Sequence, residues 1–156
     1  MSKTNWAEKE LLRLSSMYGN GDYRFFVHED GKAQRKQYGK YIVSYPDIEN
    51  YVSNLGLVLL IEVKSRHHFH RNNGYLAMKK RQKGSYETVQ DRERVPVRIV
   101  YLIGTAKSYD LYWNNLWELD IKFKEIWKDV GDIKEESYLF FHSSDFKTCP
   151  SELFNL

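Results

Sequence analysis

The chain has 156 residues, of which 42% are hydrophobic and 29% are charged, as in an ordinary globular protein of one domain. Its longest apolar run, Leu57 to Ile61, cannot span a bilayer, and the first residues lack the apolar core of a signal peptide. The single cysteine, Cys149, excludes an intramolecular disulfide. We therefore expect one cytoplasmic domain, residues 1–156, with no membrane partner.

The net charge is only +3, but the charged residues are unevenly distributed along the chain. From Lys64 to Lys83 there are seven Lys or Arg and no Asp or Glu. From Asp110 to Glu136 there are eight acidic and four basic residues. A protein with one basic and one acidic face has a preferred side for phosphate groups, so this distribution favours a nucleic-acid partner.

The first predicted element is a helix from Asn5 to Tyr18. Asn5 can cap this helix, with Glu8 following three residues later as in a capping box. The apolar residues of the segment fall on one helical face, namely Ala7, Leu11, Leu14 and Tyr18. Strands are predicted over 23–27, 41–45 and 48–52, with a turn at 28–32.

The strongest predicted strand runs from Leu57 to Val63. Its five consecutive apolar residues indicate a central strand that is buried on both faces. The remaining predicted elements are a helix over 75–92, a strand over 97–103, a helix over 111–127, a strand over 138–141 and a partly helical tail. Helices that join strands favour an α/β fold with a central mixed sheet flanked by helices.

The residues that could carry chemistry are Asp47, Glu62 and Lys64. Residues two apart in a strand point to the same face, so Glu62 and Lys64 should emerge side by side at the end of the buried strand. Asp47 lies on a neighbouring extended segment and can meet them. Two converging carboxylates repel each other unless a cation lies between them, and hard oxygen ligands suit Mg²⁺. A metal there could activate water against a phosphate, with Lys64 orienting the water or stabilising negative charge.

Glu-x-Lys is a common pattern, and by itself it is more often a pair of solvated charges at a strand end. Three features favour a functional site in this chain. The pair follows a five-residue apolar run, where isolated charges are costly. Pro46-Asp47 precedes it at short range, and a run of basic residues follows it directly.

Pro46-Asp47, then fourteen residues, then Glu62-Val63-Lys64 resembles the signature of the PD-(D/E)XK nuclease superfamily. Within it, the chain is most similar to archaeal-type Holliday-junction resolvases and related small endonucleases. Their first helix contains Ala-Glu-Arg-Glu-Leu, matched here by residues 7–11, and their central strand ends in Ile-Glu-Val-Lys, identical to residues 61–64. Their next helix and strand resemble residues 81–100, including the Pro-Val step at Pro96-Val97.

The resemblance implies a restriction-endonuclease-like fold with a nuclease core at about 5–103 and a C-terminal helical and strand addition at about 108–156. It implies that Asp47, Glu62 and the backbone carbonyl of Val63 bind Mg²⁺, for which Mn²⁺ can substitute, and that Lys64 is catalytic. Resolvases act as dimers, so a homodimer is also expected. The segment 31–45 is longer than in the resolvases, and the region after Lys107 departs from them as well.

Three further side chains have alternative interpretations. The resemblance implies that Glu8 is an additional acidic group of the metal site, but on a helical wheel Glu10 also flanks the apolar face. Gln82 would face the site as a catalytic residue, as in many superfamily members, or would be a solvent-facing helix residue.

The basic segment is predicted to contact the phosphate backbone, because cleavage requires the backbone to lie beside the metal site. The predicted DNA-contacting residues are Arg66, His67, His68, Arg71, Lys79, Lys80, Arg81 and Lys83. The alternative is a solvated loop and helix face.

The sequence therefore predicts a Mg²⁺-dependent DNA endonuclease that acts on duplex or branched DNA. The alternatives are a Holliday-junction resolvase proper, a nucleic-acid-binding module of the same fold that does not cut, and a purely structural role in a larger assembly.

Overall fold

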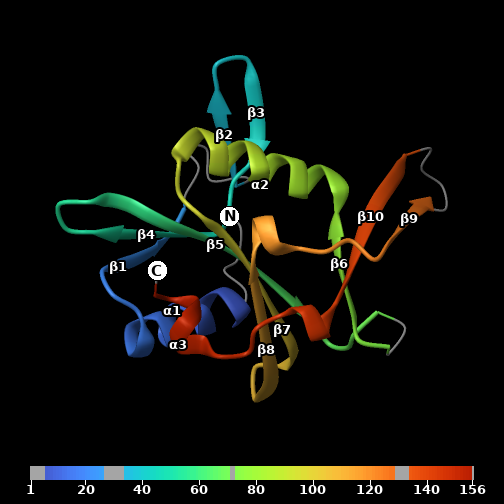
Figure 1. The fold of residues 1–156 in the computed structure, drawn as a ribbon. Coiled ribbons are helices and arrows are strands. Elements are labelled where there is room, and N and C mark those ends of the chain that lie inside the picture. The colour runs from blue at the N-terminus through green and yellow to red at the C-terminus, as the bar shows by residue number, and fades with distance from the viewer. Residues whose placement is uncertain (1–5, 27–33, 71–72, 129–133, 156) are drawn as a thin grey trace.

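The computed structural model describes residues 6–26, 34–70, 73–128 and 134–155, and a five-stranded sheet lies at its centre (Figure 1). The spatial order of the strands is β1-β4-β5-β7-β8. Their bounds are Asp22–Phe25 for β1, Ile48–Val52 for β4, Gly56–Arg66 for β5, Val97–Thr105 for β7 and Ser108–Asn115 for β8. β5 pairs with β7 in parallel and the other neighbours are antiparallel, so the predicted mixed sheet is confirmed.

Helices cover both faces of this sheet (Figure 1). α1 (Trp6–Tyr18) and the short α3 (Pro150–Leu153) pack on one face, and α2 (Lys80–Glu93) packs on the other. The alternation of side chains along β5 explains why both faces are apolar: Leu59 and Ile61 face α1, and Leu60 faces α2. All three are completely buried, which confirms the prediction that this strand is central.

A second, three-stranded sheet lies beside α2, in the order β6-β10-β9 (Figure 1). Its strands are Tyr75–Lys79 for β6, Phe123–Lys128 for β9 and Glu135–His142 for β10. A hairpin of β2 (Arg35–Tyr38) and β3 (Tyr41–Ser44) forms a separate pair of strands. Two short 3₁₀ turns, Leu116–Glu118 and Ser143–Asp145, complete the described elements.

The predicted helix over 75–92 is partly wrong, because its first five residues form β6. Leu76 and Met78 are buried there while their neighbours are half-buried, which is the two-residue period of a strand. Pairing with β10 therefore determines this segment, and the helix begins only at Lys80.

The predicted helix over 111–127 is wrong. β8 continues to Asn115, a 3₁₀ turn follows, and β9 begins at Phe123. The apolar residues of this segment are spaced about four apart, which resembles a helical face. However, β8 is rich in aromatic residues and pairs with β7 along its whole length, so tertiary pairing overrides the local pattern.

Some predicted features fall outside the described residues. These are the cap at Asn5, the turn at 28–32 and the side chain of Arg71. Among the described segments, no helix is both long enough and apolar enough to cross a membrane.

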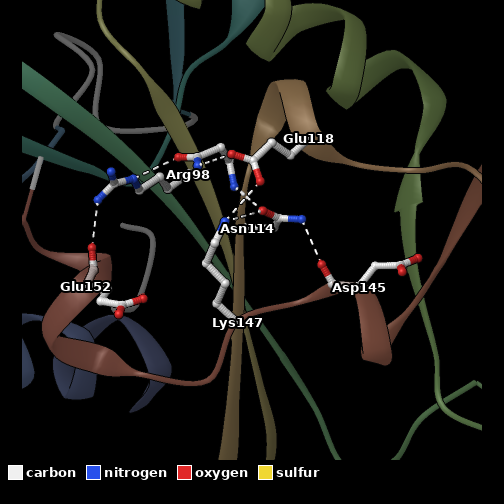
Figure 2. Close-up of polar contacts among 7 residues, drawn as sticks. Arg98, Asn114, Glu118, Asp145, Lys147 and Glu152 are labelled. Carbon is white, nitrogen blue, oxygen red and sulfur yellow. Dashed lines mark hydrogen bonds and ion pairs between the residues drawn. The ribbon is translucent and has the colours of Figure 1, made fainter.

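A buried polar cluster attaches the C-terminal segment to the central sheet (Figure 2). Arg98 on β7 donates from Nε to Oδ1 of Asn115 at 2.9 Å. The Nη1 of Arg98 donates to three backbone carbonyls at the end of α3, those of Glu152 at 3.1 Å, Leu153 at 2.6 Å and Asn155 at 2.9 Å. Carbonyls at a helix C-terminus have no partner within the helix, so this guanidinium satisfies them.

A second half of the same cluster fixes the segment before α3. The Lys147 ammonium lies 3.0 Å from the Glu118 carboxylate and 3.2 Å from Oδ1 of Asn114. The Asn114 amide in turn donates to the carbonyl of Asp145 at 2.9 Å (Figure 2). The cluster therefore explains how a segment with little secondary structure of its own is held against the sheet.

Arg98→Met should lower the free energy of unfolding by about 3 kcal/mol, because it leaves buried carbonyls and the Asn115 amide oxygen without a donor. Arg92→Met is the matched control, because Arg92 is exposed on α2 and should change stability by less than about 0.5 kcal/mol. Urea denaturation followed by circular dichroism measures both. Equal stability of the two variants would contradict a structural role for this cluster.

Candidate active site

Asp47 lies at the point where the chain enters the central sheet. It directly precedes β4, and its carbonyl accepts a hydrogen bond from the amide of Phe26 at 2.9 Å. Its side chain turns to the neighbouring strand, where Oδ2 accepts from the backbone N–H of Val63 at 3.0 Å. Asp47 is only 4% exposed. The carboxylate is therefore held against β5, as the sequence predicted for a residue on a neighbouring extended segment.

Glu62 and Lys64 share one face of β5, which is the face covered by α2. They are 7% and 8% exposed. The Lys64 ammonium lies 3.6 Å from Oε2 of Glu62 and donates to Oε1 of Gln82 at 2.9 Å. Gln82 belongs to the first turn of α2, so the helix that covers this face also positions the lysine.

The two carboxylates converge closely enough to perturb each other. The pKa of Asp47 is raised well above its ordinary value, first by burial, then by the negative charge of Glu62 and by a hydrogen bond between the two carboxyl groups. The hydrogen bond from Val63 opposes this rise but does not cancel it. Burial lowers the pKa of Lys64, and the charge of Glu62 opposes that shift.

The residues present fit a divalent cation. Oε1 of Glu62 is buried and has no hydrogen-bond partner among the described residues, which leaves an anionic oxygen unsatisfied. A cation between Asp47 and Glu62 would satisfy this oxygen and remove the repulsion that raises the pKa of Asp47. Within the described segments, no three His, Cys, Asp or Glu side chains are grouped so as to hold a metal by themselves. The donor set suits Mg²⁺, which keeps several waters and binds through one or two carboxylates together with phosphate oxygens.

The structure places Glu8, rather than Glu10, on the side of this site. The charge of Glu8 is among the causes that raise the pKa of Asp47. Glu10 instead pairs with Arg13. Burial raises the pKa of Tyr109, and the charge and hydrogen bonding of Glu10 raise it further.

One buried residue of the site was missed by the sequence analysis. Tyr86 is 2% exposed, and its pKa is raised well above the ordinary value, first by burial and then by the charge and hydrogen bonding of Glu62. It follows Gln82 by four residues on α2, so both lie on the same helical face. A helical wheel of this segment, with Gln82 taken as the residue facing the site, would have identified it.

No family model and no curated protein matches this sequence. Among solved structures, it is similar to Hjc, a Holliday junction resolvase from the archaeal hyperthermophile Archaeoglobus fulgidus. The TM-score is 0.57 at 14% sequence identity, over 96% of this chain and 98% of that chain. This chain has the fold of that resolvase. The α/β fold with a central mixed sheet, which the resemblance implies, is therefore confirmed, and the aligned region includes the segment after Lys107.

The predicted DNA-contacting residues form two groups around the site. Arg66, His67 and His68 are exposed at the end of β5 and just beyond it, and the charge of Arg66 contributes to the lowered pKa of Lys64. Lys80, Arg81 and Lys83 lie on the first turn of α2, next to Gln82.

Several of the basic side chains are paired with acids. Arg81 and Lys79 contact Glu136 of β10 at 2.8 Å and 3.7 Å. Lys83 contacts Glu87 one helical turn further on, at 3.1 Å. Exposed pairs of this kind are weak, so phosphate groups can compete for these side chains.

Asp47→Asn should stabilise the metal-free protein, by about 1 kcal/mol near pH 8. The pKa of Asp47 is higher in the folded protein than in the unfolded chain, so folding favours the protonated carboxyl group. The contribution of this group to stability is therefore fully present below its ordinary pKa of 3.8 and is lost as pH rises through the folded pKa. Asparagine has no proton to lose, and it keeps an oxygen for the Val63 amide. The gain should therefore grow with pH and be absent near about pH 4.

Urea denaturation in EDTA across this pH range tests the prediction, with Asp91→Asn as a control at an exposed position of α2. An Asp47→Asn protein that is no more stable than the unaltered protein at alkaline pH would show that the two carboxylates do not repel each other.

Proposed function

We propose that this protein is a metal-dependent DNA endonuclease that hydrolyses phosphodiester bonds at Asp47, Glu62 and Lys64. The observation that carries the proposal is the convergence of two buried carboxylates, one with an unsatisfied oxygen, beside a buried lysine. Burying such a group without a cation destabilises the folded protein. Side chains that are kept in such an arrangement without stabilising the fold are expected to be functional. The shared fold with a DNA-processing resolvase supports the same reaction class.

Each side chain has a distinct part in the proposed reaction. Asp47 and Glu62, with the carbonyl of Val63, would hold Mg²⁺ or Mn²⁺, which supplies charge stabilisation at the phosphate and activates water. Lys64 orients the attacking water, or donates to the oxygen on which negative charge develops. Gln82 accepts from the Lys64 ammonium and keeps it directed at the site. Glu8 adds a further acidic group on the α1 side.

The proposed substrate is duplex or branched DNA, which would lie across the end of β5 and the first turn of α2. Arg66, His67 and His68 on one side and Lys80 and Lys83 on the other would contact the phosphates on either side of the scissile bond. Lys79, Arg81 and Arg71 complete the predicted set of contacts. A homodimer, as the resolvase resemblance implies, would present two such surfaces to one DNA molecule.

Two alternatives remain within this fold. The first is a Holliday-junction resolvase proper, which the similarity to Hjc supports. The second is a module that binds DNA and does not cut. Against the second, the chain keeps both acids and the lysine, and all three are buried together, whereas a non-cutting relative would have no use for that arrangement.

Asp47→Asn and Lys64→Met should each reduce cleavage by orders of magnitude, because the first weakens metal binding and the second removes the charge beside the attacking water. Activity should require Mg²⁺ or Mn²⁺, with little in Ca²⁺ and none in EDTA. The assay uses purified protein with linear duplex, single-stranded, nicked and four-way-junction DNA, resolved on denaturing gels.

The matched controls are Asp91→Asn and Lys107→Met, at positions that are exposed and outside the site. In the absence of metal, Asp47→Asn should bind DNA as well as the unaltered protein or better, because a negative charge facing the phosphates is gone. Lys64→Met should bind slightly less well. Full cleavage by Asp47→Asn would show that Asp47 is not a metal ligand. Tight binding by the unaltered protein without cleavage of any of these DNAs would favour the non-cutting module.

A further inference from the structure

The β2–β3 hairpin is the part of this chain that the proposed cleavage site does not explain. It comprises residues 35–44. It pairs with no strand of either sheet, and it stands beyond α2, clear of the central sheet (Figure 1). A two-stranded ribbon that projects from a domain is stable only where something anchors it.

One face of the hairpin is attached to α2 along the length of the ribbon. Glu93, in the last turn of the helix, accepts from the Tyr38 hydroxyl at 2.7 Å and pairs with the Lys36 ammonium. Val43, opposite Lys36, packs against the core beneath α2. The inward face of the ribbon is therefore held in place, and its position relative to the site is defined.

The tip carries an exposed apolar side chain on each face of the ribbon: Tyr41, opposite Tyr38, on the face toward α2, and Ile42 on the outward face. Tyr41 is 65% exposed and Ile42 is 61% exposed. Gly39, with φ of 58°, forms the turn just before them. Ile42 lies opposite Gln37 on the outward face, beside the exposed Arg35. Exposed apolar side chains on both faces, at the end of a ribbon that is anchored to α2, indicate a tip that contacts a partner.

The charge of the hairpin indicates what this partner is. Residues 34–45 contain Arg35, Lys36 and Lys40 and no acidic residue. Arg92 and Arg94, both exposed, lie at the end of α2 on either side of Glu93, which contacts the hairpin. Such a surface attracts a polyanion, and basic side chains on either side of an apolar tip match a nucleic-acid backbone on either side of a base step.

The hairpin also leads directly into the candidate site. Only Tyr45 and Pro46 separate the end of β3 from Asp47. A fully extended chain from Tyr41 to Asp47 spans at most about 20 Å. DNA rises about 3.4 Å per base pair, so the tip reaches no further than about six base pairs from a phosphate held at Asp47.

We propose that the β2–β3 hairpin is a wedge that enters DNA where base pairing is interrupted, with Tyr41 and Ile42 against the exposed bases and Arg35 and Lys40 on the adjoining phosphates. This inference rests on the proposed function and assigns recognition of the branch point to this hairpin. Inserting apolar side chains into an intact duplex requires bases to be unstacked, which is costly. The cost is smallest where a base is already unpaired, so the wedge selects branch points over continuous duplex.

The test is the double variant Tyr41→Ser, Ile42→Ser, which removes the apolar tip and keeps the basic residues. Leu55→Ser is the matched control, because Leu55 is 72% exposed at the turn between β4 and β5. Both changes are at exposed positions, and urea denaturation should show unchanged folding. The probes are a four-way junction and a continuous duplex of the same sequence, each with 2-aminopurine at the branch point or at the equivalent position, in EDTA so that no cleavage occurs.

The unaltered protein and Leu55→Ser should raise the 2-aminopurine fluorescence of the junction, because the base next to the branch is unstacked, and should leave the duplex unchanged. The double variant should give no rise and should bind the junction about 10-fold more weakly, with unchanged affinity for the duplex. With Mg²⁺, cuts by the unaltered protein should fall within about six base pairs of the branch.

Three outcomes would overturn the wedge. The first is equal junction affinity and fluorescence for the double variant and the unaltered protein. The second is an equal loss of affinity for junction and duplex in the double variant. The third is a change of oligomeric state in the double variant, measured by light scattering, which would make the tip a contact between copies of this chain. Because the binding measurements need no metal, a protein that shows the fluorescence rise but cuts no DNA would disprove the nuclease while leaving the wedge intact.

Discussion

The burial of two neighbouring carboxylates, one just before β4 and one on β5, is the constraint on which the rest of this structure depends. Burial raises the pKa of Asp47, and the negative charge of Glu62 raises it further, because the two carboxylates repel each other. The surrounding fold holds them there nonetheless. β5 supplies the Val63 amide to Asp47, and α2 supplies Gln82 to the lysine beside Glu62. These interactions keep the repelling groups in place. The folded protein therefore retains a repulsion that a bound cation would relieve.

The centre of this arrangement could be predicted from sequence because its signals are local. The apolar run of β5 specifies a buried strand, and the two-residue period places Glu62 and Lys64 on one face. The position of Asp47 follows from the short connection between β4 and β5, which forces the two strands to pair. The choice between Glu8 and Glu10 could not be made from the helical wheel. It depends on which edge of α1 meets the sheet, and that is decided by packing.

The errors have a common physical cause. β6, β8 and β9 are specified by their partners in the sheets, and their apolar residues happen to be spaced as on a helix. β2 was missed because Arg-Lys-Gln-Tyr has no apolar run, and only its pairing with β3 and its attachment to Glu93 make it a strand. Tyr86 was missed because a buried tyrosine in a helix is usually a core residue, and only its spacing of four residues from Gln82 on α2 links it to the site.

The central claim is that Asp47 and Glu62 form a divalent-metal site. Anomalous diffraction from crystals soaked in Mn²⁺ tests it most directly, because it locates the ion without requiring activity or DNA. The account predicts an anomalous peak within about 2.3 Å of a carboxylate oxygen of each residue, and no peak there in crystals of Asp47→Asn. A well-ordered site with no anomalous density between these two side chains, at Mn²⁺ concentrations that label other sites on the protein, would contradict it.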